Sequence, residues 1–149
     1  PNVLHILWTI FFENDGPVVL YGDTTPHAGA PVDSETAVDN VLFTHDCIRG
    51  RFANGDHRGS SVSGLIEDLV AGRADPMTDD RLILNVVRYN LAFRSLNNRR
   101  LYAMKESQRL MGIEELRARI RIWPLDPISA KFVLSNTTDN EGRSVVVHQ

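Results

Sequence analysis

Two adjacent arginines follow two asparagines within the stretch RSLNNRRLYAMK, which covers residues 94–105. A strand-like run precedes Asn97 and a helical spacing of apolar residues follows Arg100, so the four polar residues stand at a strand-to-helix corner. The first backbone N–H groups of a helix have no partner within the helix, and the helix dipole makes that end positive. With the guanidinium groups of Arg99 and Arg100 in the first turn, the corner is suited to binding phosphate. Asn97 and Asn98 can hydrogen-bond sugar or phosphate oxygens without adding charge.

Charge is unevenly distributed along the chain. The formal net charge is −3, which argues against indiscriminate binding of nucleic acid. Residues 1–48 contain seven acidic residues and no Lys or Arg, whereas residues 88–121 contain nine basic residues and three glutamates. This basic band can hold phosphate locally. Alternatively it is a solvated helix face, with Arg99 and Arg100 paired to the acids of residues 13–46, and both interpretations stay open.

Further residues with possible chemistry lie in and beside the glycine-rich segment RGRFANGDHRGSS. His45-Asp46 and Asp56-His57 stand on either side of Arg51. Histidine and carboxylate side chains can ligate a divalent metal, and a metal-assisted nuclease needs such groups near the phosphate that it holds. The spacing matches no strong metal signature, so no metal ligand is assigned, and His57 is interpreted as a solvated loop residue.

Two helices are predicted from apolar spacing. The first covers VSGLIEDLV, with Ser60 or Ser61 as its N-terminal cap and Gly72 at its C-terminal end. The second begins at Asn97 and stops at Gly112. Its inner face is expected to hold three apolar residues, Leu101, Met104 and Met111.

Several segments have the pattern of strands. RLILNVVR (81–88) is a nearly continuous apolar run typical of a buried strand, and LAFRSL (91–96) can return beside it after a turn at Tyr89-Asn90. RIRIW (119–123) alternates, which favours a strand over a continued helix. KFVL and RSVVVH are expected to be closing strands.

The first residues read as an acidic extension in front of the main domain. VLHILWTIFFENDGPVVLYG predicts a hairpin that turns at Asp15-Gly16, and a loop rich in Pro, Gly, Ser and Thr follows. We therefore expect an extension at 1–37 and a domain at 38–149. The expected fold class is α+β, with a small mixed β-sheet, two to three helices and the N-terminal β-hairpin.

Composition excludes some classes of protein. The single cysteine, Cys47, excludes an internal disulfide and a cysteine-rich zinc site, and it weakly favours an intracellular location. No apolar stretch approaches the roughly 20 residues that span a bilayer, so no membrane span is expected.

The order of segments resembles the ParB/sulfiredoxin-like fold, whose members include domains described as ParB-like nucleases. The resemblance rests on VLFTHDCIRGRF, VSGLIEDLVAG, RLILNVVRYNLAFRSL and NNRRLYAMK, and it covers roughly residues 38–123. The corner is similar to the family's Gly-Glu-Arg-Arg motif and to a divergent branch that reads SLDNRRL.

The resemblance implies a phosphate of a nucleotide or nucleic acid at Asn97, Asn98, Arg99 and Arg100, with Arg51 closing over it. It implies ATP or CTP as ligands and, for hydrolysis, Mg²⁺ or another divalent metal. His45 and Asp46 are the nearest candidates for catalysis, because they match the end of the family's first strand.

The chain departs from the family pattern at the corner itself. ParB-type members carry a glutamate at the position of Asn98, and sulfiredoxin carries its reactive cysteine there, so sulfinic-acid reduction is rejected. Two functions stay open. One is a nuclease or an NTP-hydrolysing or phosphotransfer enzyme. The other is a non-catalytic interaction and assembly module that docks a protein partner through the acidic extension.

Overall fold

The computed structural model describes residues 30–44, 47–49, 61–125 and 142–148. The predicted N-terminal hairpin and the KFVL strand lie outside these residues, as do His45, Asp46 and Arg51.

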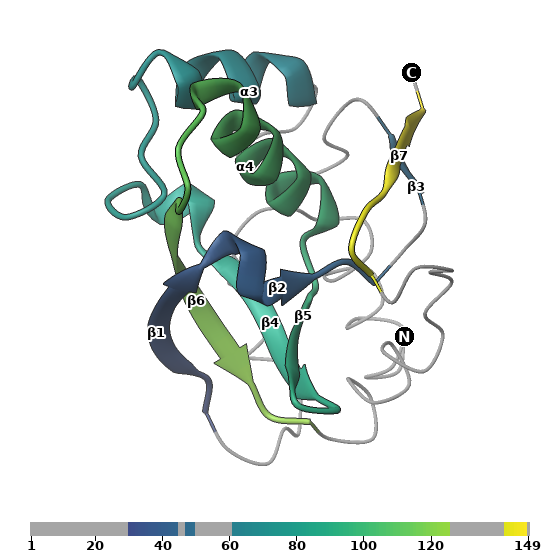
Figure 1. Cartoon of the computed structure of the whole chain (residues 1–149). Coiled ribbons are helices and arrows are strands. Elements are labelled where there is room, and N and C mark those ends of the chain that lie inside the picture. The colour runs from purple at the N-terminus through teal and green to yellow at the C-terminus, as the bar shows by residue number, and fades with distance from the viewer. Residues whose placement is uncertain (1–29, 45–46, 50–60, 126–141, 149) are drawn as a thin grey trace, which may run out of the picture.

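A five-stranded mixed sheet forms the centre of the described structure (Figure 1). Its strands are β1 (Val32–Ala37), β2 (Val41–Leu42), β4 (Leu84–Tyr89), β5 (Ala92–Ser95) and β6 (Arg117–Trp123). They lie in the order β1-β6-β4-β5-β2. The pairs β1–β6 and β4–β5 are antiparallel, whereas β6–β4 and β5–β2 are parallel. The expected α+β class with a mixed sheet is therefore confirmed.

A second, two-stranded sheet joins β3 (Cys47–Arg49) to β7 (Val146–His148) in parallel. It is tied to the main sheet just after β2, where the Phe43 N–H donates to the Gly142 carbonyl at 2.7 Å. A Cβ atom at Gly142 would come within 2.2 Å of the Phe43 carbonyl oxygen, and φ at Gly142 is +82°. Only glycine fits this close backbone approach.

The first helix forms as its apolar spacing predicts. Helix α3 runs from Val62 to Val70, and the Ser61 hydroxyl accepts from the Gly64 N–H at 2.9 Å as an N-cap. Gly72 takes a left-handed conformation after the helix ends. The helix buries Val62, Leu65 and Leu69, which keeps its apolar side against the rest of the protein.

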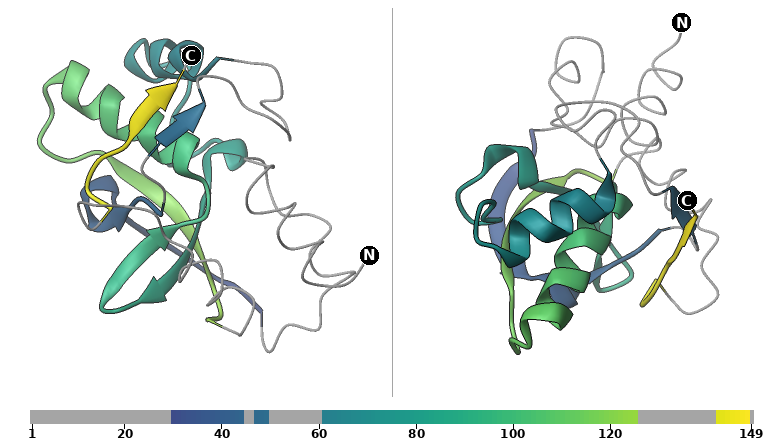
Figure 2. Two further views of the ribbon diagram at one scale, coloured as in Figure 1. Left: turned by 90° about the vertical axis from the view of Figure 1, so that its right-hand side faces the viewer. Right: turned by 90° about the horizontal axis from the view of Figure 1, so that it is seen from above.

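The second helix follows the arginine corner directly. Helix α4 runs from Asn98 to Met111 and ends at Gly112, which is left-handed with φ of 66°. Leu101 and Met104 are fully buried as expected, whereas Met111 is only partly buried. The two helices pack against each other on one side of the sheet (Figures 1 and 2).

One hydrophobic core fills the space between the sheet and the helices. Leu84 and Val86 of β4 and Ile120 of β6 alternate with residues that face the other way, and they meet the apolar side chains of α3 and α4. The sheet therefore gives α4 a fixed base, and the start of α4 lies at the end of β5.

The opposite face of the sheet carries arginines of β6 that pair with acids. Arg121 Nε lies 2.8 Å from Asp33, and Arg119 lies 2.9 Å from Asp80. Arg117 pairs with Glu35 and Glu115. The hydrogen bond from Arg121 lowers the pKa of Asp33 below its ordinary value. Part of the basic band thus pairs with the acidic front, although exposed pairs such as these stabilise a protein by only about 0–1 kcal/mol each.

Two boundaries differ from the sequence expectation. Residues 32–37, which the sequence places in the extension, form β1 and pair with β6 along their whole length. The buried strand begins at Leu84, because Asp80–Leu82 form a 3-10 turn that Asp79 caps.

Candidate functional site

Asn97 connects the start of α4 to the middle of the sheet. Its side chain occupies the N-cap position yet makes no capping hydrogen bond. Instead its Oδ1 accepts from the Asn85 N–H at 2.8 Å and from Asn85 Nδ2 at 3.0 Å. Asn85 Oδ1 in turn accepts from Trp123 Nε1 at 2.8 Å. This buried network holds β6, β4 and the helix start in one arrangement.

Asn98 connects the same helix start to the segment that leaves β2. Its Oδ1 accepts from the Thr44 N–H at 3.0 Å, and its Nδ2 donates to Thr44 Oγ1 at 2.8 Å. The Thr44 hydroxyl also donates to the Ser95 carbonyl at 2.9 Å. Thr44 and Ser95 are completely buried, and Asn98 nearly so. Two segments that are 54 residues apart in sequence therefore meet at this corner.

Arg100 points into the protein and is 0% exposed. Its Nη1 donates to the Ile83 carbonyl, just before β4, and lies 3.5 Å from Asn97 Oδ1. A buried guanidinium must keep hydrogen-bond partners because leaving it without them is costly. The described geometry therefore gives Arg100 an internal contact, and the phosphate contact that the sequence predicts for it stays a prediction.

Arg99 is only partly buried, whereas the other three corner residues, Asn97, Asn98 and Arg100, are buried. It occupies the first turn of α4, where backbone N–H groups have no acceptor within the helix. The helix dipole adds a partial positive charge at the same end. Of the four corner residues, Arg99 is the least buried.

His45 and Asp46 follow Thr44 directly but lie outside the described residues, as does Arg51. The chain is described on both sides of His45-Asp46. Thr44 is bonded to Asn98, and β3, which begins at Cys47, lies beside α4. Thr44, which precedes His45-Asp46, and β3, which follows them, therefore both lie next to α4.

Lys105 is a partly buried cation on α4. It lies seven residues after Asn98, two helical turns along the same side of α4. Its ammonium nitrogen lies 5.6 Å from the centre of the Phe43 ring. Burial lowers the pKa of Lys105, and the nearby charge of Asp39 partly opposes that effect.

Several residues of the corner could not be found from the local pattern. Thr44 and Ser95 look like ordinary strand ends in the sequence. Asn85 does carry a signal, since a carboxamide inside the apolar run LILNVV must find hydrogen-bond partners when it is buried. Its partners, however, are twelve and 38 residues away.

A cavity that is lined by described residues lies at the other end of β5. Its walls are formed by Asn40, Leu42, Arg88, Leu91, Ala92 and Phe93. Within the described ranges, no group of three or more His, Cys, Asp or Glu side chains could hold a metal ion. None of the described helices is both long enough and apolar enough to cross a bilayer.

Comparisons with protein-family models, with curated proteins and with solved structures gave no match to this chain.

Proposed function

We propose that the start of α4 binds phosphate groups of a nucleotide or nucleic acid, as the resemblance to ParB/sulfiredoxin-like domains implies. A helix of 14 residues begins there, its N-cap side chain is turned away from its first amides, and Arg99 stands in its first turn. Amides, dipole and guanidinium together form a favourable environment for an anion.

The observation that carries this proposal is the paired hydrogen bond between Asn98 and Thr44. It brings the residue before His45 to the helix start, although the two segments are far apart in sequence. A phosphate-handling site needs the anion-binding helix start and the acid, base or metal-binding groups within reach of each other. The pair supports the proposal because it joins the chain directly before His45 to the helix start.

The roles within the site follow from burial. Asn97, Asn98 and Arg100 hold the helix start in position, whereas Arg99 and the first-turn amides contact the phosphate. Arg51 closes over it from the neighbouring loop. ATP or CTP is the proposed nucleotide, and hydrolysis would use His45 or Asp46 with Mg²⁺ or another divalent metal.

The second candidate function is a non-catalytic interaction module. The observation that favours it is the internal use of Asn97, Asn98 and Arg100, whose side chains are all buried. A corner of this kind stabilises the fold without requiring catalysis. The acidic extension would then dock a protein partner.

Calorimetric titration of the full chain with ATP, CTP and a short single-stranded oligonucleotide tests the proposal. Replacing the guanidinium in Arg99→Gln should weaken binding at least about tenfold, which corresponds to roughly 1.4 kcal/mol. The matched control is Arg109→Gln on the last turn of the same helix, where Arg109 is exposed and pairs with Glu106. Binding that the two substitutions weaken equally, or no binding to any of the three ligands, would contradict the proposal.

Catalysis is tested separately from binding. The protein is incubated with plasmid DNA, RNA and labelled ATP or CTP, with and without Mg²⁺ or Mn²⁺. Turnover that is lost in Asp46→Asn while ligand binding is kept supports the enzyme. Binding without turnover, together with co-purification of another protein, supports the module.

A further inference from the structure

The tip of the β4–β5 hairpin exposes a leucine in an unfavourable backbone conformation. Asn90 and Leu91 form the two-residue turn, with φ of 53° and 64°. Positive φ at both positions is the pattern of a type I′ turn, which favours Asn followed by Gly. Leu91 takes the position that favours glycine, and its relative exposure is 102%. Neither backbone preference nor burial explains a leucine at this position.

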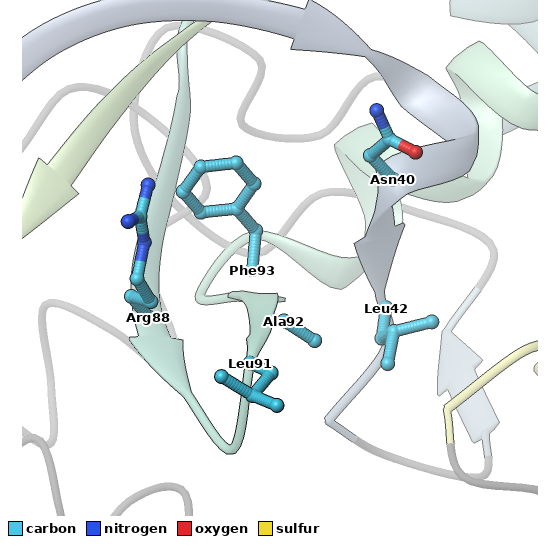
Figure 3. Close-up of a pocket in the computed structure, with 6 residues that line it drawn as sticks. All are labelled: Asn40, Leu42, Arg88, Leu91, Ala92 and Phe93. Atoms are coloured by element: carbon cyan, nitrogen blue, oxygen red, sulfur yellow. The ribbon is translucent and has the colours of Figure 1, made fainter.

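A cavity of about 390 Å³ opens beside this leucine (Figure 3). Leu91, Ala92 and Phe93 line it from the hairpin, and Leu42 lies across from Ala92 on β2. Most of this lining is apolar, and Leu91 extends it to the surface. A cavity of this size holds one or two side chains of a bound peptide.

One wall of the cavity carries a positive charge. Arg88 lies over the Phe93 ring, with its guanidinium carbon 4.9 Å from the ring centre, and its side chain is exposed. Within the described part of the chain Arg88 makes no ion pair with a carboxylate, in contrast to Arg117, Arg119 and Arg121. Stacking on the ring fixes the guanidinium while its edge stays available to an anion.

The backbone beside the cavity is already paired. Strand β2 pairs with β5 at Phe93 and Arg94. Ala92 pairs with Tyr89 next to the two-residue turn, and such a pair directs its N–H and C=O groups toward each other. The cavity therefore offers a ligand side chains and no free strand edge at Ala92.

We infer that this hairpin groove, formed by Leu42, Arg88, Leu91, Ala92 and Phe93, binds a peptide segment of a partner protein that carries an apolar side chain next to an Asp or Glu. The apolar side chain enters the cavity against Leu91 and Phe93, and the carboxylate pairs with Arg88. Charge complementarity with Arg88 selects an acidic segment. Arg88 is the one cation among the described residues that line the cavity, and its apolar surroundings favour this ligand over a polyanion. This groove does not depend on the phosphate site at the other end of β5.

Selection from a phage-displayed library of short random peptides tests the inference. The full chain is the bait, and Leu91→Asp is used for counter-selection. The enriched peptides should combine a large apolar residue with Asp or Glu. They are then synthesised with both ends blocked, and their affinity is measured by fluorescence polarisation.

Two variants and one control decide the outcome. Leu91→Gly suits the turn and removes the exposed side chain, and Arg88→Gln removes the charge; each should weaken binding at least tenfold. Arg73→Gln, at an exposed arginine after α3, should leave binding unchanged. Changing the peptide's acid to its amide should cause no further loss in the Arg88→Gln background, because the two groups contact each other.

Several results would overturn the inference. One is a selection in which no peptide binds the wild-type chain better than Leu91→Asp. Another is a set of enriched peptides that lack Asp and Glu. A third is equal affinity of the peptides for the wild type, Leu91→Gly and Arg88→Gln. Displacement of the peptide by an oligonucleotide in an Arg88-dependent manner would instead assign the groove to nucleic acid. Circular dichroism and thermal unfolding of each variant show whether a loss of binding reflects a loss of fold.

Discussion

The two ends of β5 hold their side chains in opposite ways. At the end that leads into α4, asparagines and an arginine are buried and hydrogen-bonded to the backbone and to each other. At the hairpin end, a leucine is fully exposed in a left-handed conformation, and an arginine lies on the surface of a phenylalanine ring. Polar groups are inside at the first end, and apolar groups are outside at the second.

The difference shows which of the two ends the fold depends on. Buried polar groups are costly without hydrogen bonds, so the bonds that Asn97, Asn98 and Arg100 do make fix the geometry of the helix start. An exposed leucine with positive φ costs stability and contributes no burial, so it is a candidate for selection by function. Mutations at the corner should therefore mainly lower the stability of the fold. Mutations at the hairpin tip should mainly weaken binding.

Arg100→Ala should cause the largest loss of stability. The substitution empties a fully buried site and leaves the Ile83 carbonyl without its guanidinium donor. We expect the free energy of unfolding to fall by about 3 kcal/mol or more, since both a cavity and lost charged hydrogen bonds contribute. Urea unfolding followed by tryptophan fluorescence measures the change.

The neighbouring Arg99→Ala is the matched control for this prediction. Its side chain is only partly buried, so the free energy of unfolding should change by less than about 1 kcal/mol. If Arg100→Ala unfolds like the wild-type protein but no longer binds nucleotides, Arg100 contacts the ligand, and the assignment of an internal role to it is incorrect.

The sequence predicts the helices and the central strands well because their signals are local. In α3 the apolar spacing, Ser61 and Gly72 all agree, and the alternation in RIRIW identifies β6 over a continued helix. Strand β1 was missed because VDSETA lacks an apolar run. Its acids are tolerated in a strand because it is an edge strand whose outward side chains meet the arginines of β6.

The corner could be located from the sequence, but its contacts could not. Asn97 does stand at the N-cap position, yet its side chain accepts a hydrogen bond from Asn85 of β4. It makes no hydrogen bond to the first N–H groups of the helix. Capping preference describes contacts within about three residues, whereas these bonds depend on how β4 and α4 pack. The burial of Arg100 depends on the same packing, which the local sequence does not show.

Leu91→Gly should give a moderate gain in stability. Glycine adopts positive φ without the steric cost that a leucine meets, although it also gives the unfolded chain more freedom. We expect the free energy of unfolding to rise by roughly 0.5–1 kcal/mol, because the relief of strain exceeds the added entropy. Thermal and urea unfolding measure this gain.

The control at the hairpin tip is Leu91→Ala, which keeps the cost of positive φ and should give no gain. A gain in stability in Leu91→Gly together with weaker peptide binding would sharpen the contrast between the two ends of β5. A loss of stability in that variant would mean that Leu91 packs in solution and would remove the argument for a functional tip.

Lys105→Met should have the smallest effect, seen as a change in how stability depends on pH. Burial against Phe43 lowers the pKa of Lys105 in the folded protein below the ordinary value of 10.5. Between the lowered and the ordinary pKa, the unfolded state binds more protons than the folded state. Stability from this group therefore rises with pH across that interval, and the rise should be absent in Lys105→Met.

Subtracting the pH dependence of stability of Lys105→Met from that of the wild type separates the contribution of Lys105 from that of Tyr102. Burial raises the pKa of Tyr102, so its folded state keeps a proton that the unfolded state loses, and stability falls as pH rises above 10.0. This opposite contribution is common to the wild type and Lys105→Met, so subtraction largely removes it. If the difference in stability between the wild type and Lys105→Met does not change with pH up to 10.5, the ammonium group of Lys105 keeps its hydration in the folded protein and its pKa is not lowered. Lys105 beside Phe43 would then not extend the group of buried polar residues, Asn98 and Arg100, in the first turn of α4.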